Sequence, residues 1–186
     1  MIYKDKLRGM YMDINNYNVG DYQMMCVSEK IDFLHKVHKE EISLWDDDGN
    51  DNEIWDDYFI VQNELLEHPE ILNCEDVLHI MKIFDDDCFE LSWQFNLAKI
   101  LCRNCVYYGK SRIAFYLQHL QEIPLNGRFH GWHFPIQWLL HEEYFLLLKE
   151  AVQEQTIETQ KLVLQILDGI KEYQAEKDEL RAMIDK

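Results

Sequence analysis

The stretch PIQWLLHEEYFLLLKEAV, residues 135–152, decides the fold of this chain. Apolar side chains occur on nearly every side of a helix drawn through it, because Leu139 and Leu140 are followed by the apolar run 144–148. A helix that is apolar all round is covered by neighbouring elements on every side. Pro135 suits its first turn, where a backbone N–H is not needed. The sequence therefore predicts one central helix over 135–152.

Helical spacing of apolar residues continues on both sides of this segment. On the C-terminal side, Thr156 can cap a helix over 156–170, and the charged segment 171–186 is predicted as the end of that helix, extending beyond the core. On the N-terminal side the pattern predicts further helices over 28–42, 52–68, 73–84, 87–104 and 111–122. The residues that can cap these five helices are Ser28, Asn52, Asn73, Asp87 and Ser111.

These segments predict an all-α fold, since alternating strand patterns are scarce. We expect a single domain over 1–186 with about seven helices, joined by short breaks that favour antiparallel neighbours. Pairing of successive helices into hairpins would give an irregular HEAT-like stack. Residues 1–27 have no clear period, and their structure is poorly predicted.

The length and composition fit one globular domain. The chain has 186 residues, of which 47% are hydrophobic and 13% aromatic, enough to build a core. Its cysteines, an odd number, suit reduced thiols in a cytosol better than a disulfide framework; they are Cys26, Cys74, Cys88, Cys102 and Cys105. The N-terminus does not resemble a secretory signal, and no segment approaches the roughly 18 apolar residues of a membrane span. We therefore expect a cytoplasmic protein with no membrane partner.

The charge is strongly negative and unevenly distributed. The net charge is −17, and no lysine or arginine occurs between Lys39 and Lys82. Nucleic acid and anionic membranes both need clustered cations, so this chain suits neither. A basic protein is the partner that remains, and the acidic segment would attract it.

The densest acidic stretch, 45–58, also contains aromatic side chains. Aromatic anchors beside charged groups are typical of tight protein interfaces, in which charge sets the association rate. The predicted partner-binding residues are Trp45, Asp46, Asp47, Asp48, Asp51, Glu53, Trp55, Asp56, Asp57, Tyr58, Asp85, Asp86 and Asp87. The concave side of the helical stack is the alternative position for the interface.

Two local patterns invite a metal or redox interpretation. A calcium loop starting at Asp46 would need glycine at its sixth position and glutamate at its twelfth, but Asp51 and Asp57 stand there. Cys102 and Cys105 form a Cys-x-x-Cys pair at the end of an apolar helix, without a second pair at suitable spacing. We interpret them as buried or half-buried thiols.

Histidines supply two further candidates. His35 and His38 share a predicted helical face with Glu41 nearby, a set that could hold a metal only weakly. Arg112 and His119 lie seven apart, a spacing found in some helical RNA-cleaving enzymes, but an acidic chain is poorly suited to hold RNA. We therefore predict no catalytic residue, no metal site and no cofactor.

Several segments resemble the small α-helical immunity proteins of bacterial polymorphic-toxin and contact-dependent growth inhibition systems. They are 77–86, the aromatic-rich 89–102, 114–120, 138–140 and 162–170. The likeness is one of pattern over about half the chain, without a diagnostic motif. It implies a cytosolic protein that binds a cognate toxin domain and blocks it.

The leading expectation is thus an immunity protein that neutralises a basic toxin, such as a nuclease, whose polyanionic substrate an acidic inhibitor can mimic. The first alternative is a helical-repeat adaptor that binds a non-toxin protein. The second is a metal-dependent enzyme that uses the histidines and carboxylates.

Overall fold

The computed structural model describes residues 17–39, 53–85 and 91–184. The chain divides into two compact units, 1–61 and 62–186. Every regular element in the described ranges is a helix, and none of them contains a strand. The all-α prediction is therefore confirmed for this part of the chain.

The first unit contains helix α1, Val27–Lys39, and the first half of α2, Ile54–Glu67. The prediction that Ser28 caps the first helix is wrong. The Glu29 carboxylate accepts the Cys26 N–H at 2.8 Å instead, so the helix begins one residue earlier. The apolar core of this unit comprises Ile31, Phe33, Leu34, Val37, Ile54, Tyr58 and Val61.

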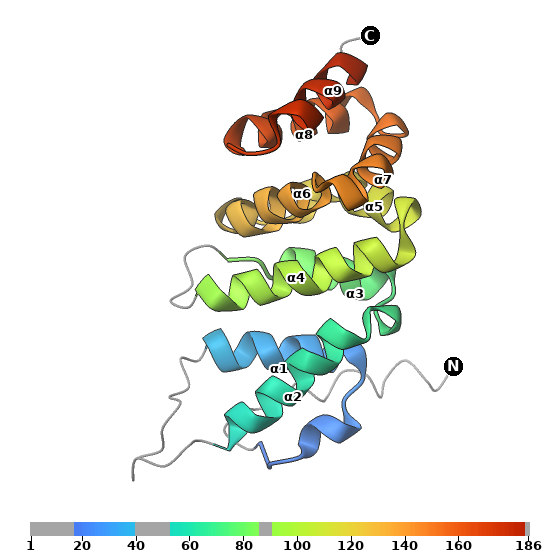
Figure 1. Cartoon of the computed structure of the whole chain (residues 1–186). Coiled ribbons are helices and arrows are strands. Elements are labelled where there is room, and N and C mark those ends of the chain that lie inside the picture. Colours follow the sequence, from blue (N-terminus) through green and yellow to red (C-terminus); the bar gives the residue numbers. More distant parts are fainter. Residues whose placement is uncertain (1–16, 40–52, 86–90, 185–186) are drawn as a thin grey trace, which may run out of the picture. The chain divides into compact units, whose positions relative to one another are not determined.

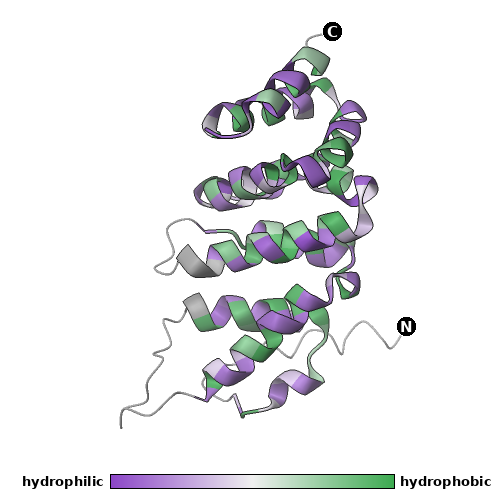
Figure 2. Cartoon of the chain, in the orientation of Figure 1, coloured by the Kyte–Doolittle hydropathy of each residue, from purple (hydrophilic) through white to green (hydrophobic). Residues whose placement is uncertain are grey.

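The second unit is built from helices, which contact their neighbours in the sequence and also helices further along the chain. They are α3 (Cys74–Lys82), α4 (Leu91–Tyr108), α5 (Lys110–Gln118), α6 (Phe134–Leu139), α7 (Glu142–Gln153), α8 (Ile157–Gly169) and α9 (Gln174–Ile184). Helix α4 packs against α3, α5 and α6; α7 packs against α5, and α9 packs against α7 and α8 (Figure 1). Hydrophilic and hydrophobic residues alternate along these helices (Figure 2), as amphipathic packing requires. A HEAT-like pairing stays a prediction.

None of the helices described combines the length and apolar character needed to cross a membrane.

Helix starts in the second unit follow the predicted caps at two places. Asn73 and Asp76 form a complete capping box at α3, with N–H to oxygen distances of 2.9 and 3.1 Å. The Thr156 side chain caps α8. The prediction for Ser111 is wrong, because α5 follows Gly109, whose φ of 66° is a left-handed conformation that favours glycine.

The prediction of one helix over 135–152 is wrong. Helix α6 ends at Leu139 and α7 begins at Glu142, with His141 extended between them (φ −57°, ψ 140°). The two glutamates that open α7 lie in its first turn, where the helix dipole favours negative charge. Leu146 is 63% exposed, so neighbouring elements do not cover this segment on every side.

Residues after 170 form a separate helix, which corrects a second prediction. Tyr173, with φ of 59°, turns the chain, and α9 then packs against α7 and α8. Leu180 is fully buried in that contact. With the break near His141, this helix raises the number of α-helices from the expected seven to nine within the described residues.

Candidate functional site

Roughly half of the predicted partner-binding residues lie outside the described part of the chain. These are Trp45, Asp46, Asp47, Asp48, Asp51, Asp86 and Asp87. The remaining residues are Glu53, Trp55, Asp56, Asp57 and Tyr58 at the start of α2, and Asp85 after α3. Their surroundings differ, and only some of them face solvent.

Glu53, Trp55 and Asp56 present acidic and aromatic groups together. Glu53 and Asp56 are exposed, and Trp55 is half-buried. The Asp56 N–H donates to the Glu53 carbonyl at 3.1 Å, which fixes the turn that leads into α2. The Trp55 ring lies 4.9 Å from that of Tyr58 and 6.0 Å from that of Phe59, centroid to centroid. Two carboxylates and an indole are therefore accessible at one helix end.

Asp57 and Tyr58 face inward, with exposed fractions of only 4% and 2%. The Asp57 carboxylate accepts the Gly20 N–H at 2.6 Å and the Tyr17 hydroxyl. Burial, together with that hydrogen bond, raises the pKa of Tyr17, so its hydroxyl stays protonated and donates. Asp57 thus ties the segment before α1 to α2, and its carboxylate is engaged within the unit.

Sequence reasoning missed two apolar residues beside this surface. Phe59 is 49% exposed and Ile60 is 45% exposed, although both belong to an otherwise amphipathic helix. The sequence could have indicated their exposure, because helical periodicity places both outside the buried face to which Tyr58 and Val61 belong. We call the set Glu53, Trp55, Asp56, Phe59 and Ile60, in which all but the half-buried Trp55 are exposed, the acidic–aromatic face.

Asp85 is half-buried and bonded within the second unit. Its N–H donates to the Gln94 side-chain oxygen at 3.1 Å, and its carboxylate accepts the Asn126 side-chain amide at 2.8 Å. These bonds join the end of α3 to α4 and to the turn before α6. Asp85 therefore has a structural role within the second unit.

Cys102 and Cys105 are completely buried on α4, as predicted. Burial raises the pKa of Cys105 to about 12, although the nearby Arg112 charge acts in the opposite direction. Burial also raises the pKa of Cys102 well above its ordinary value, and the neighbouring Cys105 adds to this. Both thiols are therefore protonated at neutral pH, which is the unreactive form.

Arg112 and His119 serve the packing of α5. The buried Arg112 guanidinium lies 4.5 Å from the centre of the Tyr108 ring and donates to the Leu72 carbonyl at 3.4 Å. His119 has its Nδ1 2.9 Å from the Phe115 carbonyl oxygen and its ring against the Phe115 ring. Both side chains are therefore engaged by neighbouring groups in or beside α5.

The histidine candidates for metal binding are placed as follows. His35 and His38 lie on α1, and Glu41 lies outside the described residues. Where the structure describes the chain, no three His, Cys, Asp or Glu side chains are grouped to hold a metal ion.

A pocket of about 380 Å³ opens between α6, the start of α7 and the α8–α9 turn. Its lining residues are Phe134, Gln137, Trp138, His141, Glu143, Tyr144 and Tyr173. Burial and a hydrogen bond to the Glu143 carboxylate raise the pKa of Tyr144. Sequence reasoning missed this pocket, because it depends on the break between α6 and α7 and on the turn at Tyr173.

A row of contacting rings leads to the pocket from a short π-helix, Phe129–His133. Phe129 contacts His130, which contacts Phe95 on α4, with centroid distances of 5.1 and 4.9 Å. Phe95 in turn lies 4.9 Å from Phe134, which lies 6.0 Å from Trp138 in the pocket wall. Phe129 is 62% exposed and Phe95 is 37% exposed, so this aromatic row is partly accessible. π-Helices are rare and occur often at functional sites.

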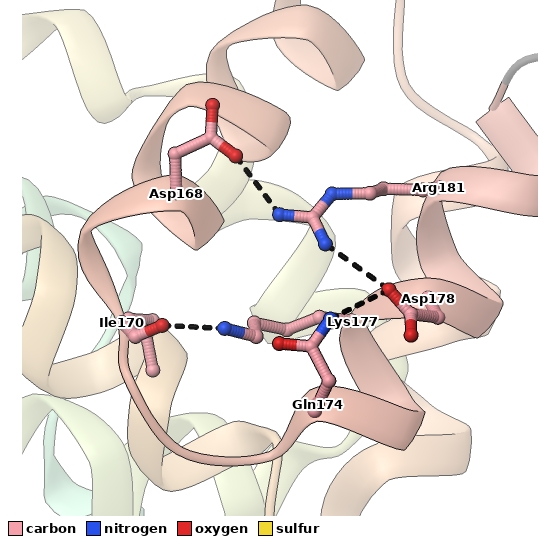
Figure 3. Close-up of polar contacts among 6 residues, drawn as sticks. All are labelled: Asp168, Ile170, Gln174, Lys177, Asp178 and Arg181. Carbon is pink, nitrogen blue, oxygen red and sulfur yellow. Dashed lines mark hydrogen bonds and ion pairs between the residues drawn. The ribbon is translucent and has the colours of Figure 1, made fainter.

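Polar contacts fix the α8–α9 turn that carries Tyr173 (Figure 3). The buried Lys177 amine donates to the Ile170 carbonyl, which ends α8, where the helix dipole favours a cation. Arg181 pairs with Asp168 on α8 at 2.8 Å and with Asp178 on its own helix at 3.2 Å. The pocket wall at Tyr173 is therefore held by bonds from both helices.

Comparison of the chain with protein-family models, with curated proteins and with solved structures gives no match, so its site residues are interpreted from their own geometry.

Proposed function

We propose that the chain is an acidic immunity protein that binds a basic toxin domain and blocks it in the cytoplasm. The observation that carries this proposal is the acidic–aromatic face at the start of α2. It combines two exposed carboxylates with Trp55, Phe59 and Ile60, of which the last two are about half exposed. Interfaces obtain most of their binding energy from such aromatic anchors.

The charge of the whole chain supports a basic partner. With 35 acidic against 18 basic residues, the chain attracts cationic proteins over distances that depend on salt. A nuclease toxin is a suitable partner because it carries positive charge to hold its own polyanionic substrate. Asp57 and Tyr58 support the face from beneath, and the direct contacts are expected at Glu53, Asp56 and the exposed aromatics.

The test is the affinity of the chain for the toxin domain encoded beside its gene, at low and at high salt. Replacing Glu53→Gln and Asp56→Asn together should slow association and weaken its salt dependence, because rim charges act mainly on encounter. The matched control is Glu67→Gln with Glu75→Gln, which removes two exposed carboxylates elsewhere and changes the net charge equally.

Phe59→Ala should act differently, by raising the dissociation rate, and a central anchor would lose roughly tenfold or more in affinity. Absence of toxin binding would refute the proposal. A stoichiometric non-toxin partner recovered from cells without the toxin would support the adaptor alternative instead.

A further inference from the structure

The pocket between α6 and α7 has the lining of a cation site. Aromatic rings of Phe134, Trp138, Tyr144 and Tyr173 supply most of its wall. The faces of aromatic rings carry partial negative charge and attract ammonium and guanidinium groups within about 6 Å. Its volume of about 380 Å³ is near the lower end of the range for small-ligand sites, which suits one side chain better than a large ligand.

The charged groups around the pocket also favour a cation. Glu143 contributes a carboxylate to the lining, and lysine and arginine are both missing from the described lining residues. A second carboxylate, that of Glu172, accepts a hydrogen bond at 3.3 Å from the Gln137 amide in the pocket wall. An anion would meet these carboxylates, and no lysine or arginine belongs to the described lining to offset them.

We propose that this pocket binds the guanidinium or ammonium end of an arginine or lysine side chain supplied by the basic partner. The inference rests on the proposed function, which supplies a partner of the required charge. The side chain would place its cationic head against the rings and beside the Glu143 carboxylate. The aromatic row from Phe129 to Trp138 leads to the same place, so the partner's surface could continue along it.

Contacts within the chain fix one wall of the pocket. Lys177 and Arg181 hold the α8–α9 turn against the end of α8 (Figure 3). This turn carries Tyr173, which lines the pocket. The Lys177 N–H also donates to the Tyr173 carbonyl at 3.0 Å. A wall fixed in this way loses little conformational freedom on binding, which favours affinity.

The first experiment uses the full chain without any partner. Nα-acetyl-arginine methylamide is titrated while the indole N–H resonance of Trp138, assigned with Trp138→Phe, is followed by NMR. The citrulline analogue is the matched ligand control, because it keeps the shape of arginine without its charge. We expect a saturable shift with the arginine probe and a much weaker one with citrulline. Equal shifts, or none with either probe, would overturn the cation site.

Variants locate the binding within the pocket. Glu143→Gln should weaken the arginine probe roughly threefold, as for a partly solvated ion pair. Glu142→Gln, a neighbouring carboxylate outside the lining, is the matched control and should change binding less. Trp138→Leu should weaken it roughly tenfold. If circular dichroism shows that this variant is unfolded, Tyr144→Leu tests another part of the pocket wall.

The toxin domain then separates the two proposals. Weaker toxin binding by Trp138→Leu and Glu143→Gln would support both. Toxin affinity unchanged in variants that no longer bind the arginine probe would overturn the placement of the partner's cation here and leave the proposed function intact. Probe binding without toxin binding would overturn the proposed function and the source of the cation, whereas the chemistry of the pocket would stand.

Discussion

Tyr173 offers a test of the pocket's backbone that is independent of its ligand. Its φ of 59° lies in the left-handed region, which costs a residue with a Cβ about 1–2 kcal/mol. Comparing Tyr173→Gly with Tyr173→Ala tests this cost without the effect of losing the ring, since both variants lack the ring and differ only in the Cβ atom. Glycine should relieve the strain but lose about 0.4–1 kcal/mol through the greater freedom of the unfolded chain.

The net expectation is that glycine is more stabilising than alanine at position 173, by about 0.5–1 kcal/mol. The same pair of replacements at Gln165, exposed within α8, is the control. There alanine should be the more stable by about 1 kcal/mol, because glycine is a poor helix former. The glycine variant should therefore be the more stable at position 173, and the alanine variant should be the more stable at position 165.

The assay is urea unfolding followed by far-ultraviolet circular dichroism. The free energies of unfolding of the four variants are compared provided that they decrease with urea concentration at the same rate. Alanine equal to or better than glycine at position 173 would refute the left-handed conformation of this turn. Both variants at 173 should also weaken the arginine probe, because both remove one aromatic wall of the pocket. A glycine variant that is more stable than its alanine counterpart yet equally impaired in binding would show that two effects are independent. One is the effect of the backbone at residue 173 on stability, and the other is the effect of its ring on ligand binding.

Three further predictions follow from buried groups. Under native conditions at neutral pH, thiol reagents should modify the exposed Cys26 and Cys74 and spare Cys102 and Cys105, as read by peptide mass spectrometry; rapid labelling of the buried pair would contradict their placement. Because burial raises the pKa of Cys105 from 9.0 to about 12, the unfolded thiol ionises first, and the free energy of unfolding should decrease as pH rises through that interval; replacing this cysteine with alanine should reduce the slope. Gly127→Ala should lower the melting temperature, since a Cβ there would lie 2.2 Å from a backbone carbonyl oxygen, and overpacking costs about 1–3 kcal/mol; an unchanged melting temperature would count against that close approach.

Sequence reasoning succeeded where the determinant was local. The capping box of Asn73 and Asp76 is encoded within four residues, and the structure contains both of its hydrogen bonds. The burial of Cys102 and Cys105 followed from the apolar helix around them. In each case the side chains that decide the conformation are close neighbours in the sequence.

Sequence reasoning failed where tertiary packing overrides a continuous apolar pattern. Neither proline nor glycine stands at the break near His141, and only the acidic pair after it indicated a new helix start. The charged composition of 171–186 concealed Leu180, which is fully buried against the preceding helices. The pocket needs both corrections, since its lining comes from α6, α7 and the turn before α9.

The ion pairs of the second unit have a consequence for the behaviour of the protein in solution. Several of the chain's cations are neutralised internally, as in Lys110–Glu154, Lys149–Glu179 and Arg181–Asp168. Each pair removes one carboxylate together with one cation, so the excess of 35 acidic over 18 basic residues remains, and two copies of the chain should repel each other at low ionic strength. At physiological salt, where the Debye length is about 8 Å, this repulsion acts only at close range. Crowded preparations of the free protein should thus resist self-association most strongly in dilute buffer, whereas added salt should bring the molecules closer together.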